Sequence, residues 1–387
     1  MLFLLAAAFL ALAAHPFTTY PLSLWVWRRL RGAAPDGARA AGGAPEPSFA
    51  ILVPAYNEEA VILEKVENLL ALQAGARDCQ ILIYVDGAAD RTAALLEPYR
   101  DRIDVVVGRT RRGKSHGLNL LVGRARADIL VFTDANVILD ERALERLGAR
   151  FADRSVGCVC GHLRYVNAGD GPTASSGDLY WRVEETIRAL ESDTVGVVGA
   201  DGSLFATRRT LHPHVPPDII DDFYVAMRVL LAGHRVVRAP DAVAYERTGA
   251  AAGPEFRRKV RIACQAFNVH RLIWRDVRRA RPGVVYAYVS HRLLKWLIAY
   301  NLAAAAALAL AGLLAALPAG TVAAGAGAAL LAGAAALALD VPPARKLGAM
   351  LVAFAGAGWG VWRSLRGERF QTWQPSADAR RPLGPHR

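Results

Sequence analysis

The amino-acid sequence predicts an α/β protein: a domain with a mostly parallel sheet, joined to membrane helices. Short β-rich runs alternate with amphipathic helical patterns between residues 48 and 280, which is typical of βα units. Long apolar stretches lie on both sides of this region. The mean hydropathy is +0.20 although 21% of the residues are charged. This combination indicates a soluble domain attached to membrane segments.

The composition excludes several classes of protein. With 53% hydrophobic residues over 387 positions, most of the chain is too apolar for intrinsic disorder. Four scattered cysteines cannot form a disulfide scaffold, and Cys158 and Cys160 are predicted to share the core face of a strand. The net charge of +12 fits a membrane surface or an anionic substrate. We expect no nucleic-acid partner, because the sequence has no nucleic-acid-binding motif.

The first 27 residues are predicted to be an uncleaved membrane anchor. Met1–Trp27 is apolar apart from a His15-Pro16 interruption, and it is long enough to cross a bilayer. A cleaved signal peptide is the alternative, but the start of the chain carries no Lys or Arg. Arginines at 28, 29 and 31 should stay cytoplasmic and leave the N-terminus outside. Residues 28–47 then form a linker rich in Gly, Ala and Pro.

The soluble domain, residues 48–280, is expected to contain five strands and five helices. The runs rich in β-branched residues predict the strands, and the amphipathic patterns predict the helices. The strands are Phe49–Val53, Gln80–Val85, Val105–Val107, Ile129–Thr133 and Val156–Cys160, and the helices are Glu58–Leu72, Arg91–Tyr99, Ser115–Arg126, Glu141–Phe151 and Tyr180–Glu191.

Residues 281–366 are expected to return to the membrane. Val284–Trp296 mixes aromatic and basic residues and predicts an interfacial helix. Leu293–Leu317, Thr321–Leu339 and Leu347–Val361 are membrane candidates. Three spans after an N-out anchor would place the basic tail, residues 367–387, outside, whereas its arginines predict the inside. The sequence therefore leaves two or three C-terminal spans open.

Two acidic residues end predicted strands of the soluble domain. Asp86 follows Ile81–Val85, and Asp134 follows Ile129–Thr133. Ligands of open α/β sheets bind beyond the carboxyl ends of the strands. Together with the loop at 54–59, which follows a third strand, these residues predict a shared site.

The segment Gly108–Ser115 (GRTRRGKS) satisfies the phosphate-loop pattern G-x-x-x-x-G-K-[ST]. A predicted strand precedes it and a predicted helix follows it, so a nucleotide triphosphatase is one alternative. However, three arginines are unsuited to a loop that must offer backbone N–H groups. The pattern also leaves Asp86 and the pair Asp221-Asp222 without a role.

Six short segments follow one another in the soluble region: Val53–Glu59 (VPAYNEE), Asp86–Thr92 (DGAADRT), Gly113–Asn119 (GKSHGLN), Thr133–Asn136 (TDAN), Gly199–Gly202 (GADG) and Asp221–Phe223 (DDF). In this order they resemble the motifs of the membrane-attached family 2 glycosyltransferases. The resemblance covers about residues 48–270 and implies a GT-A fold, which is a Rossmann-like, mostly parallel sheet.

The resemblance implies roles for these segments. Gly199–Gly202 resembles the glycine-bearing acceptor segment of the family. Asp134 and Asn136 stand at the metal-binding D-x-D motif for a divalent cation, Mg²⁺ or Mn²⁺, with Asn in the second acidic place. Asp222 stands at the general base. The implied donor-binding residues are Pro54, Ala55, Tyr56, Glu58, Asp86, Lys114, Asp134, Arg258 and Arg261.

The pair Asp221-Asp222 reads as a turn that enters a helix spanning Ile219–Leu230. One of the two is expected to be the N-cap, and the other is then free for chemistry. We find no spacing that supports a metal or triad role for the histidines, which are predicted to lie at the surface or to form hydrogen bonds; these include His116, His162 and His291.

One departure from the family bears on the product. Processive synthases carry Q-x-x-R-W after the base, whereas this chain has Arg258–Ile262 (RKVRI), in which the Arg remains and the Gln and Trp do not. The missing Trp favours transfer of one or a few sugars. A processive exopolysaccharide synthase is the alternative within the class.

The sequence thus predicts a membrane-bound inverting glycosyltransferase of hexosyltransferase type. Its donor is expected to be a nucleotide-diphosphate sugar, most simply a UDP-sugar. Its acceptor is expected to be membrane-proximal: a lipid-linked sugar, a glycolipid or a short saccharide. The enzyme is expected in the cell membrane as a multi-pass protein with its catalytic domain in the cytoplasm.

Overall fold

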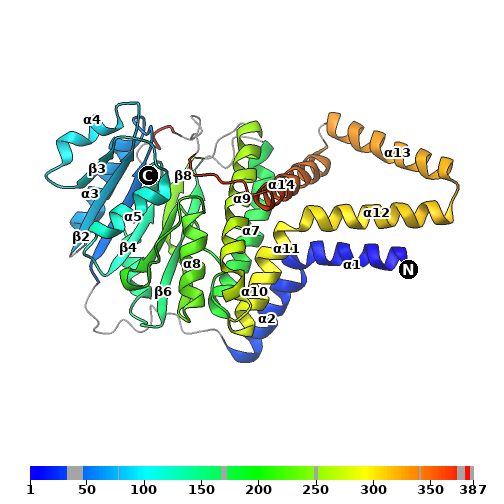
Figure 1. Cartoon of the computed structure of the whole chain (residues 1–387), viewed down its shortest axis with the longest axis horizontal. Coiled ribbons are helices and arrows are strands. Elements are labelled where there is room, and N and C mark those ends of the chain that lie inside the picture. Colours follow the sequence, from blue (N-terminus) through cyan, green and yellow to red (C-terminus); the bar gives the residue numbers. More distant parts are fainter. Residues whose placement is uncertain are drawn as a thin grey trace.

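The computed structural model describes residues 1–32, 47–76, 78–166, 172–247, 252–339, 341–372 and 380–383. Most of the predicted linker lies outside these residues. The described chain forms a sheet-containing catalytic domain, a group of helices beside it, and an arm of apolar helices that projects from that group (Figure 1).

The catalytic domain is built on one eight-stranded sheet with the order β3-β2-β1-β4-β7-β6-β8-β5. Strands β1, β2, β3 and β4 pair in parallel, as do β6 and β8, whereas β7 runs antiparallel to β4 and β6, and β5 to β8. The sheet is therefore mixed and mostly parallel. The strands are β1 Phe49–Ala55, β2 Cys79–Asp86, β3 Asp104–Gly108, β4 Ile129–Thr133, β5 Ile138–Leu139, β6 Val156–Tyr165, β7 Leu204–Arg208 and β8 Arg235–Glu246.

Helices cover both faces of this sheet, because alternate side chains of each strand point to opposite faces. In β1, Ala50 and Leu52 belong to one buried core and Ile51 and Val53 to the other. The first core is closed by α5 (Lys114–Arg124), α7 (Pro172–Asp193), α8 (Asp221–Leu231) and α9 (Ala252–Val277), and the second by α3 (Ile62–Gly75), α4 (Thr92–Leu96) and α6 (Ala143–Arg150).

All five predicted strands are present, and Ile129–Thr133 has the predicted limits. The predicted helix at Glu58–Leu72 begins four residues late, at Ile62. The backbone N–H of Glu58 donates to Oγ1 of Thr92, the first residue of α4, at 2.8 Å, so the start of this segment is bound to α4 and is not part of a helix itself.

The N-terminal apolar segment is a bent pair of helices, α1 (Leu2–Ala14) and α2 (Thr19–Arg31), joined by the short 3₁₀ helix His15–Phe17. The chain bends by 51° between the two long helices. Helix α2 packs on the catalytic domain, where Tyr20 and Leu24 are fully buried. Helix α1 packs along α12 (Ile298–Ala316), and the ring of Phe3 lies against Gly312.

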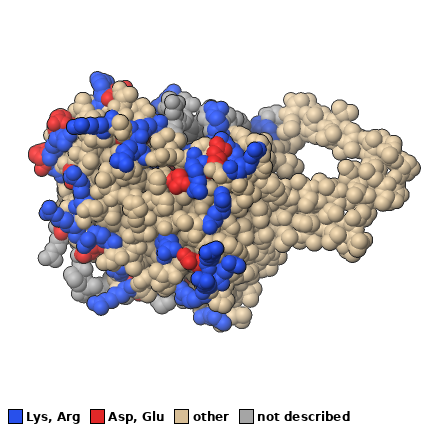
Figure 2. Space-filling model, viewed as in Figure 1, with Lys and Arg blue, Asp and Glu red and all other residues tan. Residues whose placement is uncertain are grey.

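The arm consists of α1, α12 and α13 (Ala319–Ala338) (Figure 1). Its surface shows no Lys, Arg, Asp or Glu on the face in Figure 2, whereas the catalytic domain carries many. In the described part of the chain, α12 and α13 are each long and apolar enough to cross a membrane, and the bent N-terminal pair adds a third candidate. The 19 residues of α12 span about 28 Å, close to the thickness of the hydrocarbon core.

The third C-terminal candidate has a different position. Helix α14 (Pro342–Leu365) packs on α9, where a Cβ at Gly360 would lie 2.5 Å from the carbonyl oxygen of Val260. The described residues after it contact the catalytic domain: the carbonyl of Phe370 accepts from Gln265, and Gln371 donates to the carbonyl of Arg112.

The predicted interfacial helix is also part of the protein interior. It is observed as α10 (Pro282–Ala287), a π-helical turn (Tyr288–Leu293) and α11 (Leu294–Trp296). Val284, Tyr288, His291 and Trp296 are buried against the catalytic domain.

Candidate active site

The carboxyl ends of β1, β2 and β4 meet at one edge of the sheet, as the sequence predicts. Lys114, the first residue of α5, brings two of the other segments together there. Its ammonium lies 3.0 Å from Asp134 Oδ1 and 3.5 Å from Asp221 Oδ1. The Lys114 side chain is 16% exposed. Three of the six predicted segments are therefore joined by one buried cation.

Asp86 fixes the loop that contains the phosphate-loop pattern. Its Oδ1 accepts from the backbone N–H of Arg112 at 2.7 Å, and its Oδ2 accepts from Gly113 at 2.8 Å. Tyr84 also donates to Oδ1, at 3.2 Å. A phosphate loop needs such N–H groups for phosphate oxygens. Here two of them are bound to a carboxylate, which argues against the triphosphatase alternative.

The loop after β1 carries the predicted nucleotide-binding residues. Pro54 and Ala55 end the strand, and the methyl group of Ala55 is buried in the core. Asn57 has φ of +53°, in the left-handed region that side chains seldom adopt. The guanidinium of Arg111 lies 3.7 Å from the centre of the Tyr56 ring. This strained loop presents Tyr56 beside the Gly108–Ser115 segment.

Glu58 is buried next to this loop and contacts the C-terminal segment. Arg380 Nη2 donates to its Oε1 at 2.7 Å. Burial raises the pKa of Glu58 to about 7; Arg380 opposes the shift, and Asp134 and Asp90 add to it. The local sequence gave no signal for this contact, which joins residues far apart in the chain.

The C-terminal segment crosses toward the same edge. Gln265 of α9 donates to the carbonyl of Phe370 at 2.8 Å, and Gln371 donates to that of Arg112 at 3.0 Å. The carbonyl of Gln371 lies where a side chain at position 113 would begin, and Gly113 has φ of +92°. Position 113 therefore requires glycine for two independent reasons.

The acidic pair at the start of α8 differs from the prediction in one respect. Neither Asp is the N-cap: Ile220 holds that position without a side-chain cap, and Asp221 and Asp222 are the first two helical residues. Asp221 is buried, and its Oδ2 has no hydrogen-bond partner among the described residues. Asp222 lies beside Gly202, where a Cβ would be 3.0 Å from Asp222 Oδ2.

The electrostatic surroundings of Asp222 suit a base. Burial raises its pKa to about 7; Asp221 and Asp201 raise it as well, whereas Lys114 and the backbone N–H of Phe223 lower it. A carboxylate with a pKa near 7 accepts a proton more readily than an ordinary Asp, and about half of it is ionised at neutral pH.

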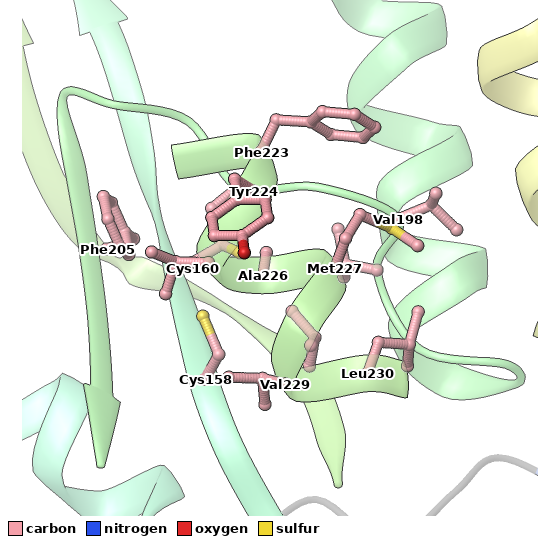
Figure 3. Close-up of a cluster of buried hydrophobic side chains, with 14 of the residues drawn as sticks. Cys158, Cys160, Val198, Phe205, Phe223, Tyr224, Ala226, Met227, Val229 and Leu230 are labelled. Atoms are coloured by element: carbon pink, nitrogen blue, oxygen red, sulfur yellow. The ribbon is translucent and has the colours of Figure 1, made fainter. Parts of the chain in front are cut away.

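Helix α8 holds Asp222 in place through its packing on β6. Figure 3 shows Tyr224, Ala226 and Val229 facing the side of β6 that carries Cys158 and Cys160. Both cysteines are buried and free, as predicted. Phe223 points away from β6 in this view. The sheet thus fixes the helix, and the first turn projects from it toward Lys114.

Asp134 and Asn136 lie where the metal-binding motif is expected. The Asp134 side chain is 37% exposed, so a ligand can reach it. Asn136 donates from Nδ2 to Glu246 Oε1 at 3.0 Å, and this bond leaves its carbonyl oxygen uninvolved. Burial raises the pKa of Glu246 to about 7, to which Asp134 and Asp201 add and which Arg258 opposes. Glu246, at the end of β8, was not predicted.

These oxygen donors fit a hard divalent cation. Within the described residues, no three His, Cys, Asp or Glu side chains are arranged to hold a metal ion. The protein therefore offers one carboxylate and one amide oxygen, and the remaining ligands would come from a bound diphosphate and water.

Helix α9 carries the two arginines at the position of Q-x-x-R-W. Burial lowers the pKa of Arg261 to about 10, and so does Arg258; Asp134 and Asp222 oppose the shift. Arg261 also donates to Gln265 Oε1 at 3.0 Å. The positive charge of Arg258 lowers the pKa of Glu246. Both arginines therefore face the acidic edge of the sheet.

Comparison with known proteins agrees with this geometry. The profile of "Glycosyltransferase like family 2" matches residues 45–265. An N-acetylglucosaminyltransferase of Mesorhizobium japonicum is 26% identical over 243 residues, which are 58% of this chain and 57% of that protein. An N-acetylglucosaminyltransferase of Rhizobium meliloti is 24% identical, over 66% of this chain and 64% of its own length. Each match spans less than two thirds of the relative.

A solved structure matches over more of the chain. The mannosyltransferase PcManGT of Pyrobaculum calidifontis, in complex with GDP-Man and Mn²⁺, superposes with a TM-score of 0.71 at 25% identity. The match covers 95% of this chain and 100% of that one. The profile covers more than half of the present chain, and the fold agrees. The chain therefore belongs to glycosyltransferase family 2 and has the GT-A fold of that family.

Proposed function

We propose that this enzyme is a membrane-bound inverting glycosyltransferase that moves one or a few sugars from a nucleotide-diphosphate donor to a membrane-proximal acceptor. The convergence around Lys114 carries the proposal. Segments that were singled out separately in the sequence meet at this one ammonium, which lies 3.0 Å from Asp134 and 3.5 Å from Asp221, and the negative charge of Asp222 helps to raise its pKa.

The reaction needs a base on one side of the sugar and positive charge at the leaving group. Asp222 takes the proton of an acceptor hydroxyl, whose oxygen attacks the anomeric carbon while the bond from that carbon to the diphosphate oxygen breaks. The products are the glycoside and the nucleoside diphosphate, and the anomeric centre is inverted. Arg258 and Arg261 supply positive charge toward the departing diphosphate.

Asp134 and Asn136 are the residues that would hold a divalent cation. When bound, such an ion neutralises charge on the donor diphosphate. Lys114 holds the Asp134 side chain in place through the contact of 3.0 Å. The solved relative contains Mn²⁺ and GDP-Man. Our proposal retains a UDP-sugar as the simplest donor and includes GDP-sugars in the test.

The arm supports the membrane part of the proposal. It carries apolar surface outward and leaves the acidic edge in the catalytic domain (Figures 1 and 2). We propose that α12 and α13 cross the membrane as a hairpin, with the catalytic domain on the cytoplasmic side, where nucleotide sugars are made. The arginines at 28, 29 and 31 lie in the last turn of α2, after the N-terminal apolar segment, and basic residues that flank an apolar segment favour the cytoplasmic side.

The direct test is a donor panel. Purified protein in detergent is incubated with UDP-, GDP- and TDP-sugars, Mn²⁺ and octyl glycosides as acceptors, and both released nucleoside diphosphate and glycosylated product are measured. We expect one donor class to be consumed with formation of product that has the opposite anomeric configuration. A product that keeps the donor's configuration, or no product with any donor, would contradict the proposal.

Replacing Lys114 with Ala separates this function from nucleotide triphosphate hydrolysis. We expect the wild-type protein to have no ATPase activity and the variant to transfer sugar at least about tenfold more slowly, because Asp134 and Asp221 lose their shared cation. Phosphate release from ATP and nucleoside-diphosphate release from the sugar donor are measured side by side. A robust wild-type ATPase that disappears in Lys114→Ala would favour the triphosphatase.

The pH dependence of kcat/KM should report Asp222. Its pKa is raised to about 7, and only the ionised form accepts a proton. We expect kcat/KM to rise with pH up to about 7 and then to level off, about tenfold per pH unit on the rising side. In Asp221→Asn the neighbouring negative charge is lost, so the rising limb should move to lower pH. An unchanged limb in that variant would show that another group titrates.

A further inference from the structure

A buried ion cluster lies between the catalytic domain and the helices that lead to the arm. It consists of Glu184, Arg188, Glu191, His291, Arg292 and Lys295. Its acidic members lie on α7, and His291, Arg292 and Lys295 lie on the π-helical turn and α11. The side chains of Glu191 and His291 are fully buried, and that of Glu184 is 4% exposed.

The cluster is closed by short contacts. His291 Nδ1 lies 2.7 Å from Glu191 Oε1, and His291 Nε2 lies 3.2 Å from Glu184 Oε2. Lys295 donates to Glu184 as well. From the membrane side, the hydroxyl of Tyr20 in α2 donates to Glu191 Oε1 at 2.7 Å. Two segments adjacent to the arm are therefore bound to α7: helix α2, which follows α1, and the π-helical turn with α11, which precedes α12.

The cluster also holds the backbone of Val198, directly before the acceptor segment Gly199–Gly202. Glu191 Oε2 accepts from the N–H of Val198 at 3.1 Å, and Arg292 Nε donates to the carbonyl of Val198 at 2.5 Å. Both polar groups of this peptide position are therefore bound by side chains of the cluster. The next residue, Gly199, has φ of +101°, and a Cβ there would lie 2.6 Å from the ring of Phe223 and 3.0 Å from Arg292 Nη2.

Two contacts connect Arg292, which binds Val198, with Asp222. The guanidinium of Arg292 lies 5.6 Å from the centre of the Phe223 ring, and the N–H of Phe223 donates to Asp222 Oδ1 at 2.5 Å. On the other side, Arg188 Nη1 lies 3.9 Å from Asp201 Oδ2. The residue after Asp201 is Gly202, which lies beside Asp222. Arg292 thus contacts both Val198, which precedes the acceptor segment, and Phe223, which follows Asp222.

Burying so many charges is a poor way to gain stability, because the desolvation cost offsets the attraction between them. A buried charge network does, however, fix geometry, since each member tolerates few arrangements. The guanidinium of Arg292 offers a planar set of donors at fixed angles, which a lysine cannot reproduce. This favours a role in positioning.

We propose that Arg292 is a positioning residue, which sets residues 198–202 and the first turn of α8 relative to the membrane-proximal helices. The inference rests on the proposed function. It assigns to the buried ion cluster the task of aligning an acceptor hydroxyl, carried at the membrane surface, with Asp222. The donor side of the site, around Asp86 and Tyr56, is independent of it.

The test compares Arg292→Gln and Arg292→Lys with a matched control. Arg209 makes the same kind of bond, from Nε to the carbonyl of Ala127 at 2.9 Å, at the opposite end of β4. We expect Arg292→Gln to lower the transfer rate to octyl glycosides about 10- to 100-fold, in line with the cost of a misplacement of about 1 Å. The dissociation constant for UDP or GDP with Mn²⁺ should stay within about twofold of wild type. Arg209→Gln should change neither quantity.

Two further readouts separate positioning from loss of structure. Hydrogen exchange of the peptide that contains Val198 should accelerate in Arg292→Gln and not in Arg209→Gln. Arg292→Lys keeps the charge and should fold even where Gln does not, with transfer between wild type and Gln. Equal transfer rates in the Arg292 and Arg209 variants, or loss of nucleotide binding together with transfer, would overturn the inference. A wild-type protein that transfers no sugar would instead refute the proposed function, and rapid exchange of the Val198 peptide in the unaltered protein would refute the positioning role on its own.

Discussion

Asp222→Asn should lower sugar transfer by about two orders of magnitude or more, the range of positioned base catalysis, and should leave donor binding near normal. An acceptor hydroxyl is a poor nucleophile until its proton is removed, and the amide of Asn has the shape of the carboxylate without its basicity. Transfer is followed by product formation, and binding by titration of UDP or GDP with Mn²⁺.

Asp221→Asn is the matched control for this change. Asp221 is the neighbouring residue of the same helix turn, carries the same side chain, and is bound to Lys114 at 3.5 Å. Its loss should weaken the hold on Lys114 and slow transfer less than the loss of Asp222. Normal turnover in Asp222→Asn together with inactive Asp221→Asn would exchange the two roles. Normal turnover in both would place the active site elsewhere.

The residues of the site that directly follow strands could be predicted from the sequence. Asp86 and Asp134 each end an apolar run, and the rule that ligands bind beyond the carboxyl ends of parallel strands then places them together. The structure has both strands, with β4 at its predicted limits, and connects Asp134 to Lys114. Local pattern sufficed here because both the strand and its terminal residue are encoded in a few consecutive positions.

The parts that the sequence did not predict depend on contacts between distant residues. Glu246 reaches Asn136 only because β8 pairs with β6 and β5, and β8 itself, with Pro240 and Asp241 inside it, lacks a clear strand pattern. Arg380 meets Glu58 across more than 300 residues. The N-cap expected at Asp221 or Asp222 is Ile220, and Asp221 is bound to Lys114 instead of capping the helix.

The apolar pattern also could not predict whether the helix at 347–361 faces lipid or packs on protein. Hydropathy singled out the segment around α14 as a candidate span, and composition alone cannot tell a lipid-facing helix from one that packs on protein. The contacts of α14 come from the structure: Gly356 and Gly360 lie close to Phe256 and Val260 of α9. Small residues allow close helix contact in either setting.

Asp134→Ala should abolish metal-dependent transfer. Asn136 is neutral and cannot hold a divalent cation alone, and within the described residues no third acidic or histidine ligand is arranged with them. Binding of Mn²⁺ in the presence of UDP or GDP, measured by the loss of the free-ion EPR signal, should weaken at least about tenfold, in keeping with the loss of a charged ligand. This readout does not depend on turnover. Full activity of Asp134→Ala in EDTA would remove the proposed metal site.

Asn136→Asp tests the same site in the opposite direction. The substitution restores a second carboxylate and should lower the Mn²⁺ concentration needed for half-maximal binding. It also turns the donor that faces Glu246 at 3.0 Å into an acceptor, so two carboxylates would stand at hydrogen-bond distance without a cation between them. We therefore expect the variant to unfold at lower temperature than wild type in EDTA and to regain stability with Mn²⁺ and nucleotide. Glu246→Gln combined with Asn136→Asp should remove the thermal penalty, because a Gln amide can donate to the new carboxylate. If Asn136→Asp needs as much Mn²⁺ as wild type, the second position of the motif lies outside the metal site.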